Sequence, residues 1–125
     1  MWNFDMISFG DGDSVVESNE SCLHLMEYIQ KLSSLQSELR IIIDLMPQRS
    51  DHVPFLENNV PAIACSTGEA RDYPYYHTTK DTIENVHPTL AIHLLKLVSV
   101  SFVSFLHFGI FPELSLFPEK EVDDN

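Results

Sequence analysis

Cysteine and basic residues are both scarce in this sequence of 125 residues. Two cysteines, Cys22 and Cys65, are too few for a disulfide framework, although they can pair once. Seven lysines and arginines stand against nineteen aspartates and glutamates, which gives a formal net charge of −12. A phosphate backbone or an anionic lipid surface would be repelled, so the composition argues against nucleic acid as a partner. The first residues also lack the basic and apolar regions of a signal peptide.

What the sequence does contain fits one soluble globular domain. The hydrophobic fraction is 44% and the charged fraction is 21%, both ordinary for such a protein. An acidic surface suits solubility, cation binding or attraction of the positively charged end of a ligand. Neither an internal repeat nor a low-complexity segment is found.

Apolar runs alternate with turn signals along the chain, and the alternation predicts an α/β fold with a sheet covered by helices on both faces. Cys22, Leu25, Met26, Ile29 and Leu32 recur on one face of a helix, which Ser18 or Asn19 can cap. Strands are expected at residues 1–9, 39–46 and 60–65, the second as a buried central strand. Residues 14–17 can be a strand or a loop, 50–56 a turn entering a short helix, and 66–84 a loop.

A long apolar helix is expected after Pro88, ending near Gly109. It is apolar around nearly its whole girth, which predicts that it is mostly buried. A membrane span is the alternative, but the uncharged run after Lys96 covers only residues 97–111, short of the ~20 that a span needs. Membrane association is therefore not favoured. Residues 111–125 are expected to form an acidic C-terminal tail.

Two strand acids and one loop histidine stand out as candidates for chemistry. Asp5 and Asp44 lie in apolar strands, where a carboxylate is costly unless it is paired or binds a metal. At the carboxyl end of a strand, Asp5 would face the crevice in which α/β sheets bind ligands. His77 follows tyrosines and precedes hydroxyls and an acid, so it can be a metal ligand or simply a solvated side chain.

The other histidines carry weaker signals. Ser50, Asp51 and His52 superficially suggest nucleophilic catalysis, but adjacent residues rarely form a catalytic triad. The remaining histidines follow no metal-binding spacing and fit surface or core-edge positions: His24, His87, His93 and His107.

Four segments in order resemble one family. They are residues 3–7 (NFDMI), 50–55 (SDHVPF), 59–62 (NVPA) and 76–82 (YHTTKDT). Together they resemble the C-terminal half of the zinc exopeptidases that include bacterial leucyl aminopeptidase, aminopeptidase Y and glutaminyl-peptide cyclotransferase. The resemblance implies that residues 1–110 form part of an α/β/α sandwich with a mixed, mostly parallel sheet covered by helices. It also implies a secretory or extracellular location.

The resemblance implies a site for two zinc ions and a peptide substrate. Asp5 would bind one zinc and His77 the other, with Ser50 and Asp51 beneath the site and Tyr76 lining the substrate pocket. The metals would lower the pKa of a shared water and polarise the scissile carbonyl, while a glutamate carries the proton. The free amino end of the peptide would lie among acids.

This sequence departs from the family pattern in a way that bears on activity. The family also has an upstream His-x-Asp and a Glu-Glu pair, which supplies the general base, and neither occurs here. One carboxylate and one imidazole cannot fill a tetrahedral zinc shell. We therefore expect no peptidase activity from this chain alone, and a partial gene model, a split gene or a truncated product would explain the pattern.

Two alternatives stay open at this point. Glutaminyl-peptide cyclotransferases typically have an acidic pair where this chain has Ser50 and Asp51, and Trp where it has Tyr76. Both positions favour the aminopeptidase branch. The other alternative is a non-catalytic fragment that docks on a partner, because half a sheet leaves an exposed edge strand.

Overall fold

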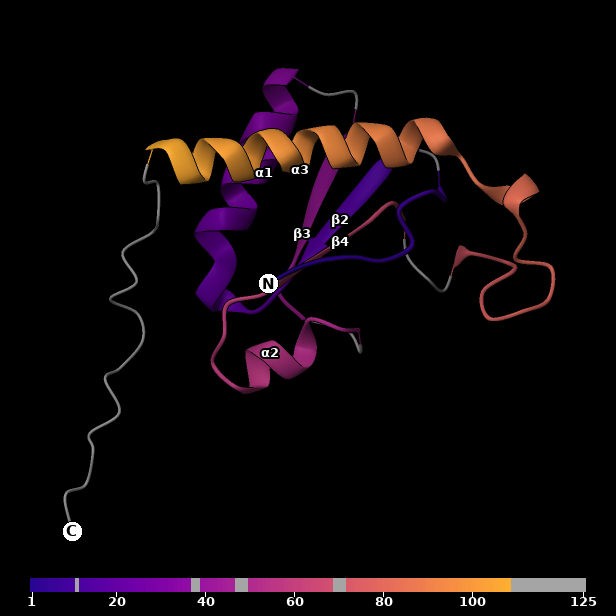
Figure 1. Cartoon of the computed structure of the whole chain (residues 1–125), viewed down its shortest axis with the longest axis horizontal. Helices are drawn as coiled ribbons and strands as arrows, with labels where there is room; N and C mark the ends of the chain where they lie inside the picture. Colours follow the sequence, from indigo (N-terminus) through magenta and orange to yellow (C-terminus); the bar gives the residue numbers. More distant parts are fainter. Residues whose placement is uncertain (11, 37–38, 47–49, 69–71, 109–125) are drawn as a thin grey trace, which may run out of the picture.

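The computed structural model describes residues 1–10, 12–36, 39–46, 50–68 and 72–108 (Figure 1). The expected acidic tail, Gly109 and the domain boundary at residue 110 lie outside this part of the chain. Its elements are β1 (Trp2–Phe4), β2 (Asp13–Glu17), α1 (Leu23–Gln36), β3 (Arg40–Asp44), α2 (Val53–Glu57), β4 (Ile63–Ser66) and α3 (Pro88–Phe108). Two 3-10 helices, Glu20–Cys22 and Ile83–Asn85, precede α1 and α3.

The strands form a mixed sheet in the order β1-β4-β2-β3. Strand β4 runs parallel to β1 and antiparallel to β2, and β2 runs parallel to β3. The predicted α/β class and mostly parallel sheet are confirmed. The short segment after residue 12 is a strand and lies inside the sheet, whereas the predicted central strand at residues 39–46 was placed wrongly. Strand β3 lies at the edge of the sheet that the described residues form, and its isoleucines alternate between buried Ile41 and exposed Ile42.

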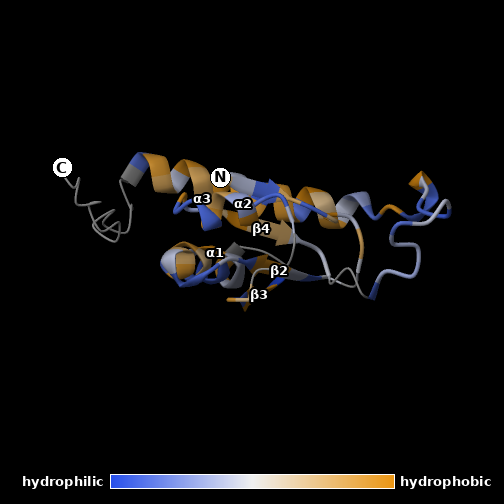
Figure 2. Ribbon diagram, turned by 90° about the horizontal axis from the view of Figure 1, so that it is seen from below, coloured by the Kyte–Doolittle hydropathy of each residue, from blue (hydrophilic) through white to orange (hydrophobic). Residues whose placement is uncertain are grey.

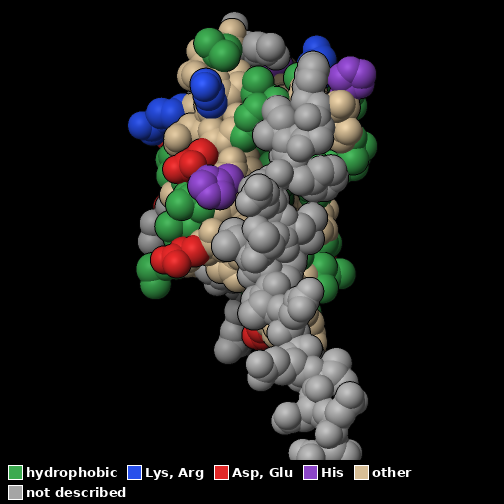
Figure 3. Space-filling model, turned by 90° about the vertical axis from the view of Figure 1, so that its left-hand side faces the viewer, with side chains coloured by type: hydrophobic (Ala, Val, Ile, Leu, Met, Phe, Trp, Pro, Cys, Tyr) green, Lys and Arg blue, Asp and Glu red, His purple; other side chains and the backbone are tan. Residues whose placement is uncertain are grey.

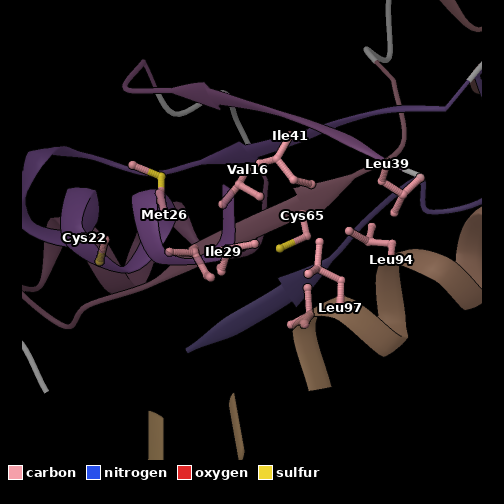
Figure 4. Packing of buried hydrophobic residues seen from close by; sticks show 11 residues of the cluster. Val16, Cys22, Met26, Ile29, Leu39, Ile41, Cys65, Leu94 and Leu97 are labelled. Atoms are coloured by element: carbon pink, nitrogen blue, oxygen red, sulfur yellow. The ribbon is translucent and has the colours of Figure 1, made fainter. Parts of the chain in front are cut away.

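Helices α1 and α3 pack on the same side of the sheet. Within the sheet, Val16, Ile41, Ile63 and Cys65 belong to the buried cluster that includes residues of both helices. Figure 4 shows Val16, Ile41 and Cys65 beside the side chains of the helices. Figure 1 shows α3 along the top of the view and α2 below the strands. Both cysteines are free and buried, so the possible pairing is absent, and burial raises the pKa of the Cys65 thiol to about 12.

The helix predicted from the stripe at residues 22–32 is confirmed as α1 with the 3-10 turn before it. Asn19 is the cap, because its Oδ1 accepts a hydrogen bond from the Ser21 N–H at 3.1 Å. Met26 and Ile29 are completely buried and face the sheet. The 3.6-residue period therefore located this helix and its core face correctly.

The prediction that the last helix is buried around its girth was wrong. Helix α3 buries Leu94, Leu97, Val98 and Ser101, which recur on one face, and its outer face stays exposed. Figure 2 shows how hydrophobic the helix remains along its length. By length and composition Pro88–His107 could cross a membrane, with 22% of it buried here. Several exposed apolar side chains lie on it: Ile92, Leu95, Val100, Phe102, Val103 and Leu106.

Candidate metal site in a tyrosine-lined pocket

Asp5 follows directly after β1 and has an exposed side chain. Its backbone N–H donates to the Cys65 carbonyl at 3.1 Å, which continues the pairing with β4 for one residue. The predicted strand over residues 1–9 is much shorter: β1 ends at Phe4, and Met6 adopts a φ of 53°, which lies outside the extended range of a strand. The expectation of a buried carboxylate was therefore wrong: Asp5 lies at the end of the strand and in contact with solvent.

A short relay of hydrogen bonds holds the Asp5 carboxylate. The Ser50 hydroxyl donates to Asp5 Oδ2 at 3.0 Å and accepts from Asn3 Nδ2 at 2.8 Å. Asn3 lies two residues before Asp5, on the same face of β1, and is buried. Asp51 follows Ser50 and has an exposed side chain. Ser50 thus holds one carboxylate oxygen of Asp5, and its role beneath a metal site stays a prediction.

Asp5 and His77 line one pocket of about 330 Å³. The chain segment after β1 forms one wall, and the tyrosine-rich loop and the 3-10 helix before α3 form the other. Tyr76, predicted to contact substrate, also lines this pocket. The pocket brings together three of the residues selected from the sequence. Its lining residues are Asp5, Met6, Ser8, Phe9, Tyr73, Tyr76, His77, Asp81, Asn85 and Val86.

Aromatic contacts hold the loop that carries His77. Tyr73 packs on Phe9 with ring centroids 4.7 Å apart and on Tyr75 at 5.8 Å. Its hydroxyl donates to Asp81 Oδ1 at 2.6 Å, and this hydrogen bond raises the pKa of Tyr73 to about 12. This hydrogen bond joins the two ends of the loop at residues 73–81, which contains His77.

Strained backbone collects at the pocket. His77 adopts a φ of 55°, and its ring stacks on Tyr76 with centroids 3.9 Å apart and an interplanar angle of 17°. In the described part of the chain, Met6, Asn59 and His77 are the non-glycine residues with positive φ. Two of these three line the pocket, one from each wall. Such conformations cluster at functional sites, where the surrounding structure holds them in place.

The donors in the pocket fit part of a zinc site. A carboxylate oxygen from Asp5 and an imidazole nitrogen from His77 are both ordinary zinc ligands. Among the described residues, no group of three or more histidine, cysteine, aspartate or glutamate side chains is placed to hold a metal ion. The roles of Asp5 and His77 as ligands therefore remain a prediction.

Sequence reasoning missed the residues that support the pocket. Asn3 lies two residues before Asp5, a spacing that places both on one strand face and could have identified it. Tyr73 and Asp81 belong to the tyrosines and the acid that flank His77 in the sequence, but their hydrogen bond to each other could not be predicted, because it depends on how the loop folds back over eight residues. Asp44, the competing strand acid, lies outside the pocket and accepts a hydrogen bond from the Met46 N–H at 2.8 Å.

These features define an α/β protein with a tyrosine-lined pocket, containing a carboxylate and an imidazole, beside the carboxyl end of β1. The family pattern of Peptidase family M28 matches residues 1–101, and the chain belongs to this family. Members of the family are generally metal-dependent, and the chain is peptidase-like. A comparison with curated proteins found no match.

Solved aminopeptidases share the fold. Two crystal structures of the Legionella pneumophila aminopeptidase LapA match with a TM-score of 0.67 and 23% identity over 84% of this chain. The aminopeptidase from Aneurinibacillus sp. strain AM-1 matches with a TM-score of 0.63 and 22% identity over 83% of it. This chain spans only 30%, 31% and 25% of those three chains, respectively.

Proposed function

We propose that this chain contributes one part of a metal-dependent aminopeptidase site. The observation that carries the proposal is the pocket shared by Asp5 and His77, which are far apart in the sequence of a chain from Peptidase family M28. The strained backbone at Met6 and His77 supports the proposal, because Met6 directly follows Asp5 and His77 is itself a proposed ligand.

Each residue has a defined role in this proposal. Asp5 binds metal through its carboxylate, which Ser50 orients by its hydrogen bond to Oδ2. His77 supplies an imidazole nitrogen from the opposite wall, and Tyr76 beside it contacts the substrate side chain. When bound, zinc ions lower the pKa of a water molecule and polarise the scissile carbonyl. Acids near the pocket attract the positive amino end of a peptide.

The proposed site is incomplete in this sequence. Two protein donors cannot complete a tetrahedral zinc shell, and the Glu-Glu pair that would supply the general base is missing. We therefore propose that the 125-residue chain binds zinc weakly and hydrolyses no peptide by itself. The greater length of the solved aminopeptidases is consistent with further site residues on a longer chain or assembly.

Calorimetric titration with zinc tests the proposed ligands. Asp5→Asn and His77→Gln should each weaken zinc binding about tenfold or more, because each removes one ligand from an already incomplete set. His24→Gln is the matched control. His24 is an exposed histidine on α1 that lies 3.7 Å from the Glu27 carboxylate, so it also pairs an imidazole with a carboxylate, but outside the pocket. Zinc binding that is unchanged in both pocket variants would show that the pocket is not the metal site.

A chromogenic leucyl substrate tests the absence of activity. The chain should release no product above buffer, with or without added zinc. Chelator-sensitive hydrolysis that is lost in Asp5→Asn would contradict the proposed incompleteness. A peptide with N-terminal glutamine, assayed in parallel, distinguishes the cyclotransferase alternative, which Tyr76 and the Ser50-Asp51 pair do not favour.

A second candidate function is docking on a polypeptide that completes the fold. Among the described residues, β1 pairs with β4 and with no other strand, so its outer edge is open. Exposed apolar residues of α3 lie next to this edge, because Phe102 packs edge-on against Trp2 at 5.6 Å. An open edge beside an apolar surface favours association with another strand and helix.

A further inference from the structure

His52 is completely buried although it belongs to a solvent-exposed turn. It immediately precedes α2, and its carbonyl accepts the N–H groups of Phe55 at 3.1 Å and Leu56 at 3.2 Å. Its side chain makes no capping bond. Burial lowers the pKa of this imidazole, so the ring is neutral near pH 7 and carries one N–H.

Glu17, at the end of the inner strand β2, faces the buried ring. It ends β2, where its register partners are Ala64 of β4 and Asp44 of β3. Its Oε1 lies 3.4 Å from Nε2 of His52, and its side chain is 15% exposed. Within the described residues neither ring nitrogen makes a full hydrogen bond, so this carboxylate is the polar group that the imidazole approaches. Leaving such a ring without any polar contact would be costly.

The pair is connected to the Asp5 carboxylate through the turn that carries Ser50. Ser50 precedes His52 by two residues and donates its hydroxyl hydrogen to Asp5 Oδ2. The Val53 N–H donates to the Ser50 carbonyl at 3.1 Å, which closes the turn around His52. The position of Ser50 therefore depends on a turn that is anchored at one end by the buried His52 ring.

We propose that Glu17 and His52 are positioning residues, which fix the turn at Ser50 and thereby orient the Asp5 carboxylate toward the pocket. The meaning of that orientation rests on the proposed metal-binding function, whereas the anchoring itself does not. Residues that orient a metal ligand typically change metal affinity by about 10–100-fold when they are lost. Loss of either residue should therefore loosen the turn at Ser50 more than it loosens the rest of the fold.

Four substitutions separate positioning from packing. His52→Leu fills much of the buried space but removes the ring nitrogen that faces Glu17, and His52→Gln places an amide near the position of Nε2. Glu17→Leu removes the carboxylate, and the double variant His52→Leu with Glu17→Leu tests whether the two residues act as a unit. His24→Leu, on the exposed face of α1, is the control.

Amide hydrogen exchange is the first measurement, because it needs no metal. In His52→Leu, exchange at the Val53 amide should quicken about tenfold relative to the amides of β4, which reports local opening of the turn. His52→Gln should stay within about threefold of the parent, and the double variant should match His52→Leu. Equal acceleration at Val53 and in β4 would identify His52 as a packing residue only and overturn the proposal. If His52→Leu does not fold, Glu17→Leu must show the same selective change at Val53, and its absence overturns the proposal.

Zinc affinity is the second measurement, made by calorimetry on the same variants. His52→Leu should bind zinc about tenfold more weakly than the parent, and His52→Gln should recover most of the loss. Unchanged zinc affinity together with a loosened turn would contradict the link to Asp5. If the parent chain binds no zinc, the proposed function fails, and the exchange measurement still decides whether Glu17 and His52 anchor the turn.

Discussion

The half-buried Tyr73 has a pKa well above the ordinary value of a phenol. Its hydroxyl donates to the Asp81 carboxylate, and ionisation would both break this bond and place two negative charges together, so its pKa rises from 10.0 to about 12. We predict that ultraviolet titration of the phenolate band shows one tyrosine with this late midpoint. Asp81→Asn should return that midpoint toward 10.0, because the charged acceptor is gone.

The raised pKa also predicts the direction of a stability change. Folding keeps Tyr73 protonated, so its contribution is fully present below the unfolded pKa of 10.0 and is lost as the pH rises through about 12. Unfolding midpoints in denaturant should therefore fall more steeply over this range in the parent than in Asp81→Asn. Asp72→Asn is the control, since Asp72 is exposed in the same loop. Equal slopes in the parent and Asp81→Asn would contradict the role of the hydrogen bond.

The candidate donors and the neighbouring Tyr76 could be selected from the sequence, but the hydrogen bonds that hold them could not. Asp5 and His77 stand out by residue type and local motif, and both line the pocket. The exposure of Asp5 was predicted wrongly, because the apolar residues after it suggested a longer strand than Trp2–Phe4. The Ser50 contact joins residues 45 positions apart, and no local pattern specifies such a hydrogen bond.

Helix α1 offers a test of the core at the scale of an element. Met26 is completely buried between the helix and the sheet. We predict that Met26→Ala lowers the free energy of unfolding by about 2–5 kcal/mol, because it removes buried methylene groups and leaves a cavity. Leu35→Ala is the matched control on the same helix, and with 71% of Leu35 exposed it should change stability by less than about 0.5 kcal/mol.

Chemical denaturation of both variants checks this prediction. A similar loss of stability in Met26→Ala and Leu35→Ala would show that the face of α1 toward the sheet is not the principal core contact. A small effect of both would mean that α1 packs loosely.

Elements with one apolar face were predicted better than elements that are apolar throughout. Helix α1 can bury its apolar stripe in only one orientation, with the stripe facing the sheet, and the structure has the helix in that orientation. Helix α3 and strand β3 are apolar on more than one side, which predicted burial all round. Composition shows how apolar an element is, but not how many neighbours it meets, and in the described residues both elements are packed mainly from one side.

The molecule combines a strongly acidic composition with an apolar surface on α3 that is exposed among the described residues. We define the α3 stripe as Ile92, Leu95, Phe102, Val103 and Leu106, which are all more than a third exposed. On the side of the molecule drawn in Figure 3, hydrophobic side chains lie among charged and histidine side chains where grey atoms do not cover them. The net charge of −12 opposes self-association, whereas the α3 stripe and the open edge of β1 favour a complementary partner.

Charge placed in the α3 stripe tests whether this surface is available for docking. Val103 is 62% exposed, so Val103→Lys should fold normally and interrupt the stripe. We predict that it lowers the fluorescence of a bound apolar dye about twofold or more, because the dye binds exposed contiguous apolar surface. Ile83→Lys is the control: Ile83 is 77% exposed in the 3-10 helix before α3, and its replacement should leave dye binding unchanged. If both lysine variants lower the signal equally, the dye does not single out the α3 stripe, and the case for docking beside β1 loses its support. If only Val103→Lys does so, the surface beside the open strand edge is accessible, as docking of a completing polypeptide requires.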